Sequence, residues 1–176
     1  MRLALAALVM IPLAACVEVD VRDDAPTGSS SRPAVSSSES AHAEYLYREQ
    51  GAAPDAQVNP GQAFNDYRAA NGLPRLARSS QLTAAAAAQA RDMARMDQLT
   101  HEGANGSSVG DRARAQGYDY ATVAENVAWT PRGFPTVMEV WNNSSGHRAN
   151  MLKRNVTQYG IARSGDYWAL VVGRPK

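Results

Sequence analysis

Histidine is scarce in this sequence, and two of its three histidines lie in short polar stretches that follow apolar runs. His101 lies in "LTHEG" and His147 in "SSGHRANML", with Glu125 between them in "AENVAW". Imidazole titrates near neutral pH and serves as a metal ligand or a proton carrier, so two such residues could share a site. The residues alone allow three separate structural roles: His101 capping a helix end, His147 at a helix entry, and Glu125 binding backbone amides.

The length and charge of the chain limit the classes of protein that it can be. Its 176 residues suffice for one domain with its own core. The net charge of +1 gives no electrostatic argument for nucleic-acid binding. Residues 17–58 carry eight acids and three bases, whereas residues 59–176 carry nine acids and fourteen bases. The bases are scattered single arginines, as on a solvated surface.

The N-terminal segment predicts export. Arg2 is followed by an apolar run over residues 3–15, which is too short to span a bilayer and has the order of a secretory signal. The four residues that end at Cys16, "LAAC", resemble the lipobox of bacterial lipoproteins. The resemblance implies that a signal peptide, residues 1–15, is removed and that fatty acyl chains on Cys16 anchor the chain to the membrane. Cys16 is the only cysteine, so no disulfide within the chain is expected.

The segment after the cysteine predicts a lipidated flexible tether over residues 16–59. It is rich in Ser, Pro and acidic residues and lacks apolar periodicity. Within it, "AEYLYREQG" (43–51) could form one or two helical turns. Val17 stands where enteric-type lipoproteins carry an aspartate for inner-membrane retention. The expected location is therefore the cell envelope, and the outer membrane if the source cell has one.

Residues 60–176 predict a single α+β domain. Apolar periodicity, caps and turn residues predict four helices: residues 60–71, Ser79 or Ser80 to near Leu99, residues 109–116 and residues 136–144. A further helical turn is predicted in "HRANML". Residues 118–130 predict a strand or an extended loop, and residues 157–174 predict a hairpin around "SGD". Gly146 is expected to interrupt the last helical region, and Pro131 to Pro135 to precede it.

The order of these motifs resembles the CAP superfamily of cysteine-rich secretory, antigen 5 and pathogenesis-related proteins. The matching stretches are "FNDYRAANGLPRL", "LTHEG", "AENVAW", "VWNNSSGHRANML" and "YGIARSGDYWALVVG". Five motifs in register make the resemblance specific, and it is closest to the short bacterial branch with SCP-like domains. It implies that residues 60–176 form an α-β-α sandwich with a small antiparallel sheet between helices and an open cleft.

The resemblance also implies that His101, Glu125 and His147 converge on that cleft. Two imidazoles and a carboxylate could hold zinc with an open coordination position, or could orient a water without metal. Many eukaryotic members have a second glutamate at the position of Ser144. Glu139 lies two residues before Trp141 and on another side of a regular helix, so it is not expected to substitute. A weakly bound divalent metal, such as zinc, is the expected cofactor if any.

Other residues in these motifs are expected to support the cleft structurally. Asn65, Asn126, Asn150, Ser144, Ser145 and Arg148 lie in or beside the motifs, and the asparagines are suited to bonding backbone groups. Arg68 and Arg148 are expected to pair with acids beneath the cleft. The three tryptophans, Trp129, Trp141 and Trp168, are expected in the core.

Two classes of function remain open. The first is a non-enzymatic envelope module that binds a lipid, glycan, peptide or protein through its cleft or surface. The alternative is a metal- or water-dependent hydrolase that acts on peptide or cell-wall bonds in the same cleft. A serine hydrolase is disfavoured because Ser144 and Ser145 lie in no Gly-x-Ser-x-Gly stretch.

Overall fold

The computed structural model describes residues 57–176 and the backbone of Ala34 and Val35. The predicted signal peptide, Cys16, "AEYLYREQG" and most of the predicted tether lie outside the described residues. Ala34–Val35 forms a two-residue strand, β1, which pairs in parallel with β3 (Gln98–Leu99). The sequence pattern of the tether did not predict this strand.

A four-stranded sheet forms the middle of the domain, in the order β2-β5-β6-β4. The strands are β2 (Ala77–Arg78), β4 (Tyr120–Trp129), β5 (Gln158–Ser164) and β6 (Tyr167–Pro175). The β5–β6 hairpin around "SGD" is confirmed, and its turn uses Gly165 at φ +57°, a conformation that favours glycine. β4 pairs antiparallel with β6, but β2 pairs parallel with β5, so the sheet is mixed. The expectation of an all-antiparallel sheet missed β2, because two residues are too short to show a strand pattern.

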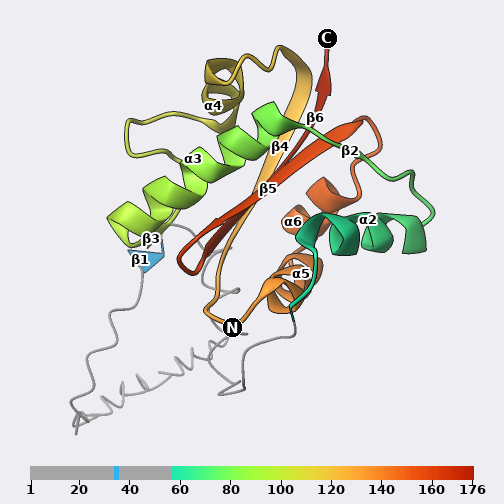
Figure 1. Cartoon of the computed structure of the whole chain (residues 1–176), viewed down its shortest axis with the longest axis horizontal. Helices are drawn as coiled ribbons and strands as arrows, with labels where there is room; N and C mark the ends of the chain where they lie inside the picture. Colours follow the sequence, from blue (N-terminus) through green and yellow to red (C-terminus); the bar gives the residue numbers. More distant parts are fainter. Residues whose placement is uncertain (1–33, 36–56) are drawn as a thin grey trace, which may run out of the picture. The chain divides into compact units, whose positions relative to one another are not determined.

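Helices cover both faces of this sheet. The helices are α2 (Pro60–Ala70), α3 (Ser80–Met96), α4 (Val109–Ala115), α5 (Phe134–Asn143) and α6 (Ser145–Met151). Figure 1 shows α3 and α4 on one side of the sheet and α2, α5 and α6 on the other. The predicted α-β-α sandwich is therefore confirmed.

The central strand β6 is buried on both faces, because its side chains alternate between two cores. Trp168, Leu170 and Val172 pack into the core beneath α2, α5 and α6. The intervening residues of β6, among them Ala169 and Val171, pack into the core beneath α3 and α4. This alternation places neighbouring residues of each strand in different surroundings, which matters for the site below.

Several helix boundaries differ from those predicted. Ser79 caps α3 as expected, but α3 ends at Met96, where Asp97 takes a left-handed conformation at φ +51°. The Pro131–Pro135 stretch does not all precede the next helix, because α5 begins at Phe134 and accepts a proline in its first turn, where no amide donor is needed.

The break between α5 and α6 falls at Ser144, two residues before the predicted break at Gly146. Ser144 has an extended backbone, and its hydroxyl accepts from the His147 amide at 3.4 Å. Gly146 lies inside α6. Because Ser144 serves as a helix cap, it does not occupy a regular helical position relative to Glu139.

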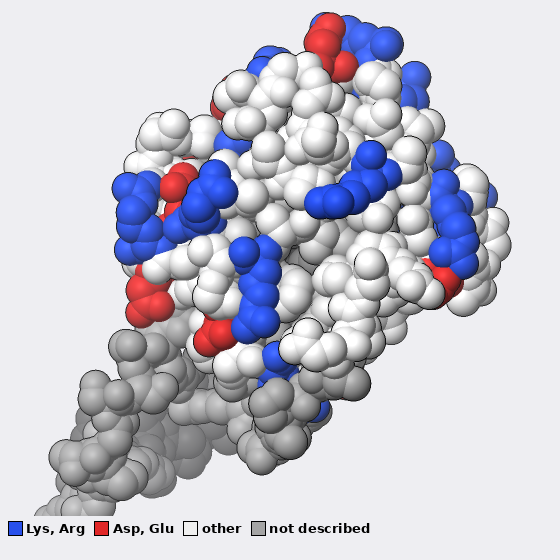
Figure 2. All heavy atoms as spheres, in the orientation of Figure 1, with Lys and Arg blue, Asp and Glu red and all other residues white. Residues whose placement is uncertain are grey.

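The described surface shows no single concentration of charge on the face drawn in Figure 2, where basic side chains are dispersed and several lie beside acids. This fits the predicted solvated surface. Among the described residues, none of the helices combines the length and apolarity needed to cross a membrane.

Candidate functional site

A histidine and a buried carboxylate form the centre of the site. His101 lies in the loop after β3, and its Nδ1 is 3.0 Å from Oε1 of Glu125 on β4. The Glu125 side chain is 1% exposed, whereas that of His101 is 57% exposed. The structure thus brings together two of the three predicted cleft residues, with the imidazole between the carboxylate and solvent.

Arg112 on α4 neutralises the buried carboxylate. Its Nη2 donates to Glu125 Oε2 at 2.8 Å and to Oε1 at 3.0 Å. The same nitrogen donates to the carbonyl of His101 at 3.1 Å, and Nη1 donates to the carbonyl of Ser107 at 2.5 Å. The Arg112 side chain is only 5% exposed. One guanidinium therefore holds both the carboxylate and the loop that carries His101.

The start of α4 places Arg112. Ser108 and Asp111 form a capping box in which the Ser108 hydroxyl accepts from the Asp111 amide and the Asp111 carboxylate accepts from the Ser108 amide. The Ser108 hydroxyl also donates to Asp111 Oδ2 at 2.6 Å, and this bond first and the Ser108 amide second hold the pKa of Asp111 below its usual range. The helix then begins at a fixed point, with Arg112 one residue past the capping box.

A second carboxylate ties the loop to α3. Asp92 Oδ2 accepts from the Ala104 amide at 2.9 Å, and Oδ1 accepts from Arg95 at 2.9 Å. Burial favours a higher pKa for Asp92, but the Ala104 amide and the charges of Arg95 and Arg112 outweigh it, so the pKa lies below its ordinary value. The loop from His101 to Ser107 is thus fastened to both helices of this layer.

The other face of β4 carries an uncharged network. Asn126 is fully buried, and its Nδ2 donates to the carbonyl of His147 at 2.9 Å. Asn150 donates to Asn126 Oδ1 at 3.0 Å and to the Glu125 carbonyl at 3.2 Å. Because Glu125 and Asn126 are neighbours on a strand, their side chains face opposite layers. The predicted amide-to-backbone roles of Asn126 and Asn150 agree with these contacts.

This network also covers the free edge of the sheet. β4 is an edge strand, and its outward carbonyls would otherwise be open to pairing with another strand. Asn150 donates a hydrogen bond to the carbonyl of Glu125, and Trp141 Nε1 donates one to the carbonyl of Val127 at 3.0 Å. Helices α5 and α6 therefore close the edge beside the site.

His147 lies on α6 and is 8% exposed. Its carbonyl accepts a hydrogen bond from Asn126 and its amide donates one to Ser144, so these two residues hold its backbone in the first turn of α6. Within residues 57–176, no three His, Cys, Asp or Glu side chains lie together as a group that could hold a metal ion. Both Glu125 oxygens already accept hydrogen bonds from Arg112 or His101.

The remaining predicted site residues have structural contacts. Arg148 donates to the carbonyl of Asn142 at 2.6 Å. Ser145 is the first residue of α6 and Glu139 lies on α5. The pairing of Arg68 with an acid was wrong: its buried guanidinium donates to the carbonyls of Pro74, Met151 and Lys153. Burial lowers the pKa of Arg68.

Sequence reasoning did not identify Arg112. The residue lies in "DRARA", where it has the same local pattern as the exposed Arg114 two residues later. The spacing of Ser108 and Asp111 in the sequence is typical of a capping box and indicates where the helix begins. Only the packing of α4 on β4, however, decides which arginine turns inward to Glu125.

The three-layer fold, with a histidine–carboxylate pair at its edge strand, defines an SCP-like domain. The family model described as the cysteine-rich secretory protein family, CAP, matches residues 62–171, and the chain belongs to this family. The resemblance seen in the sequence is therefore confirmed.

Two relatives from Bacillus subtilis (strain 168) match part of the chain. The protein YkwD, described as uncharacterized, is 32% identical over 106 residues, and the uncharacterized membrane protein YlbC is 27% identical over 104 residues. Each match covers 59% of this chain, but only 41% of YkwD and 30% of YlbC. The chain thus spans less than half the length of either relative.

Solved structures of bacterial proteins share the fold. An extracellular protein with an SCP domain from Bacillus anthracis str. Ames superposes with a TM-score of 0.63 at 24% identity, covering 65% of this chain and 39% of that one. An outer surface protein from Borrelia burgdorferi gives 0.60 at 16% identity, covering 66% and 90%. The structural neighbours named here are extracellular or surface proteins, which is consistent with an envelope or secreted location.

Proposed function

We propose that this CAP protein is a non-enzymatic binding module of the cell envelope, and that it takes its ligand at His101. The observation that carries the proposal is the full engagement of Glu125 by Arg112 and His101. A carboxylate held in this way accepts a proton-bearing Nδ1 and leaves Nε2 of a neutral imidazole as a lone-pair donor. The high exposure of His101 makes that nitrogen available to a ligand from solvent.

The ligand at this position must offer a hydrogen-bond donor or a cation. A hydroxyl or amide of an envelope lipid, glycan, peptide or protein meets the first requirement. A divalent metal meets the second, with His101 as its ligand and Glu125 behind the imidazole as an orienting group. Such a metal would be held weakly, because Glu125 would have to leave Arg112 to coordinate it directly.

Zinc titration by calorimetry tests the site. We compare the wild type with His101→Ala and His147→Ala at about pH 7.5 and about pH 5.5. Binding at the higher pH should be lost in His101→Ala and should weaken on acidification, because metal binding needs neutral imidazole. Loss in His147→Ala as well would make the two histidines joint ligands. Equal binding in all three proteins would contradict a metal site at His101.

A hydrolase remains the second candidate, and the His101–Glu125 pair favours it. A carboxylate-oriented imidazole could act as a general base toward a water. Its test is hydrolysis of peptide and cell-wall substrates by the wild type and by His101→Ala. Activity that the variant lacks, while its melting temperature is unchanged, would replace the binding proposal.

Membrane attachment through Cys16 belongs to the same proposal, and "LAAC" behind a short apolar run supports it. Fatty-acid labelling of the expressed chain should label the wild type and not Cys16→Ala. Cys16→Ala should also leave the membrane fraction, since a lipid-free chain loses the free energy of acyl-chain burial, about 0.8 kcal/mol per CH₂. Persistent labelling of the variant would overturn the anchor.

A further inference from the structure

Helix α3 carries two glutamines, and one of them is buried among its apolar residues. Gln89 is fully buried, whereas Gln81 is exposed. The buried side of the helix otherwise consists of leucine, alanine and methionine side chains. Burying an amide is costly unless it makes hydrogen bonds, so the partners of Gln89 indicate what the amide does there.

The partners of Gln89 are the two backbone carbonyls on either side of His101. The Gln89 Nε2 donates to the Thr100 carbonyl at 2.5 Å and lies 3.5 Å from the Glu102 carbonyl. The carbonyl between them, that of His101, accepts from Arg112 Nη2 at 3.1 Å. Three consecutive carbonyls of the loop therefore turn inward, toward buried donors from two helices.

The orientation of the Gln89 amide follows from these contacts. Turning the amide over would set its Oε1 against the Thr100 carbonyl oxygen, and two acceptors repel each other. In the orientation observed, Oε1 is buried and accepts no hydrogen bond from the described residues. An unmet buried acceptor destabilises a fold, so packing alone gives no reason for a glutamine here. The useful part of the side chain is its donor, which serves the loop at His101.

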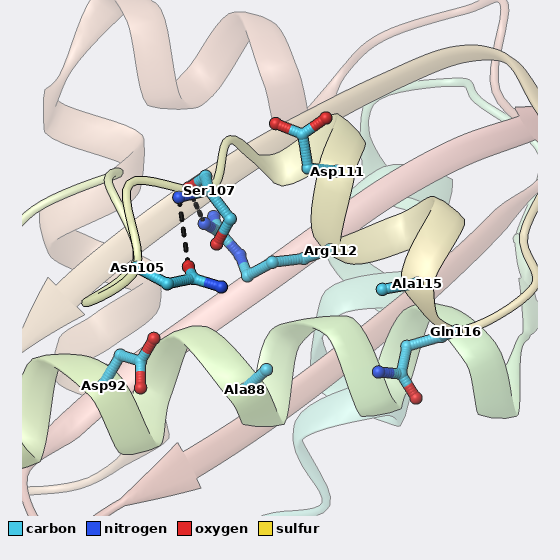
Figure 3. Close-up of a pocket in the computed structure, with 8 residues that line it drawn as sticks. All are labelled: Ala88, Asp92, Asn105, Ser107, Asp111, Arg112, Ala115 and Gln116. Atoms are coloured by element: carbon cyan, nitrogen blue, oxygen red, sulfur yellow. Dashed lines mark hydrogen bonds between the residues drawn. The ribbon is translucent and has the colours of Figure 1, made fainter.

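The buried contacts of this loop differ in which part of it they hold. Figure 3 shows Arg112 reaching from α4 toward Ser107, near the far end of the loop. Asp92, three residues after Gln89 on the same side of α3, accepts from an amide in the middle of the loop at 2.9 Å. Gln89 holds the near end, where the histidine lies.

We propose that Gln89 is a positioning residue, which fixes the tautomer and orientation of His101 by holding the backbone on both sides of it. This inference rests on the proposed role of His101 as the residue that takes the ligand. With the flanking carbonyls held, His101 Nδ1 stays 3.0 Å from Glu125 Oε1, and Nε2 keeps its lone pair for the ligand. In a loop that can shift, the ring leaves the carboxylate, and either nitrogen can then carry the proton.

NMR of the His101 ring nitrogens tests the proposal without a ligand. We compare the full chain with Gln89→Met and Gln81→Met at about pH 8, where an ordinary imidazole is neutral. The wild type should give the nitrogen shifts of one tautomer, with the proton on Nδ1. Gln89→Met has a similar length but no donor, so its shifts should move toward the average of two tautomers. Unchanged His101 shifts in Gln89→Met would overturn the proposal.

Gln81→Met is the matched control. It also removes a hydrogen bond from a glutamine of α3 to a backbone carbonyl, that of Gly117 at 3.0 Å, but away from the histidine. Its His101 shifts should equal those of the wild type. If Gln89→Met does not fold, Gln89→Asn decides, since it keeps the amide but is one methylene too short. A single tautomer in Gln89→Asn would then overturn the proposal.

Zinc titration separates this proposal from the proposed function. If the wild type binds zinc through His101, Gln89→Met should bind it about tenfold more weakly, as is usual when the partner that orients a ligand is lost. Equal zinc affinities in these two proteins would refute the positioning role of Gln89. If the wild type binds no zinc, the metal-binding role of His101 fails, and the tautomer comparison still decides the role of Gln89.

Discussion

The two helical layers pack on the same sheet by different means. Beneath α2, α5 and α6 the core is built from large rings: Phe134 lies 6.0 Å from Trp141 and 5.4 Å from Trp168 between ring centroids. Beneath α3 the core includes several alanines, and at Gly160 a Cβ would lie 2.1 Å from the Thr83 amide nitrogen. The α3 layer therefore touches the sheet with its backbone at Gly160, where the sheet strand has no side chain.

The polar groups follow the same division. The charged cluster of His101, Arg112 and Glu125 lies on the α3–α4 side, where one of its members reaches water. On the aromatic side, the hydrogen-bonded groups that join β4 to α6 are amides and carbonyls. Arg68 on α2 is the exception, because its buried guanidinium is held by the carbonyls of Pro74, Met151 and Lys153 and not by a carboxylate. Burying an ion is costly unless such partners surround it. Four predictions test this contrast, in order of decreasing effect.

Removing the largest ring should cost the most. Trp141→Ala deletes a fully buried side chain and its hydrogen bond to the Val127 carbonyl. We expect a loss of about 5 kcal/mol in the free energy of unfolding, at the upper end of such substitutions. Denaturant unfolding measures it, with Trp141→Phe as the control that keeps a ring. A loss below about 2 kcal/mol would mean that this layer does not depend on its rings.

Breaking the ion pair on the other side should rank second. Arg112→Met leaves Glu125 buried beside His101 alone, so we expect a loss of about 3 kcal/mol in the free energy of unfolding. Arg112→Lys retains the charge but not the two-oxygen contact and should lose less. The His101 ring signals in NMR should move in both variants, since the loop and the carboxylate lose their shared partner. Unchanged His101 signals would show that Arg112 does not position the histidine.

Adding one methyl group where α3 touches β5 should rank third. Gly160→Ala places a Cβ against backbone atoms of Leu82 and Thr83, which cannot rotate away. We expect a loss of about 2–3 kcal/mol from overpacking. Gly173→Ala is the matched control on β6, because its nearest neighbours are mostly side-chain atoms at 3.0 Å or more. If both variants lose the same stability, the close backbone contact is not what distinguishes this layer.

The smallest effect should come from Tyr167, which donates to Asp97 Oδ1 at 2.8 Å at the end of α3. Burial first, and the neighbouring Asp97 second, raise the pKa of its phenol above the usual value. A raised pKa stabilises the fold fully below about pH 10, and this stability falls as the pH rises further. Tyr167→Phe should lose about 1 kcal/mol near neutral pH and should flatten the alkaline decline. An unaltered alkaline profile would contradict this coupling.

The sequence predicted most of the fold because its signals were local. Ser79, Gly72 and the "SGD" turn act within a few residues, and the structure has a helix start, a helix stop and a hairpin at these points. The site was predictable only in part. The family resemblance implied that His101, Glu125 and His147 share a cleft, but the position of Arg112 and the carbonyl partners of Arg68 depend on contacts between distant segments. No local pattern distinguishes an arginine that turns inward from one that faces water.

The position of β6 at the centre of the sheet has a consequence for how the domain folds. Its neighbours β4 and β5 hydrogen-bond to it and not to each other, and β4 precedes it by about forty residues. A growing chain can therefore pair β2 with β5, but it cannot join β4 to them in one sheet until β6 has been synthesised. Long-range pairing of this kind is slow, and the unpaired β4 stays available to wrong partners in the meantime. Folding of the domain thus waits for β6, and a truncation at residue 165, which removes this strand, should abolish folding rather than weaken it.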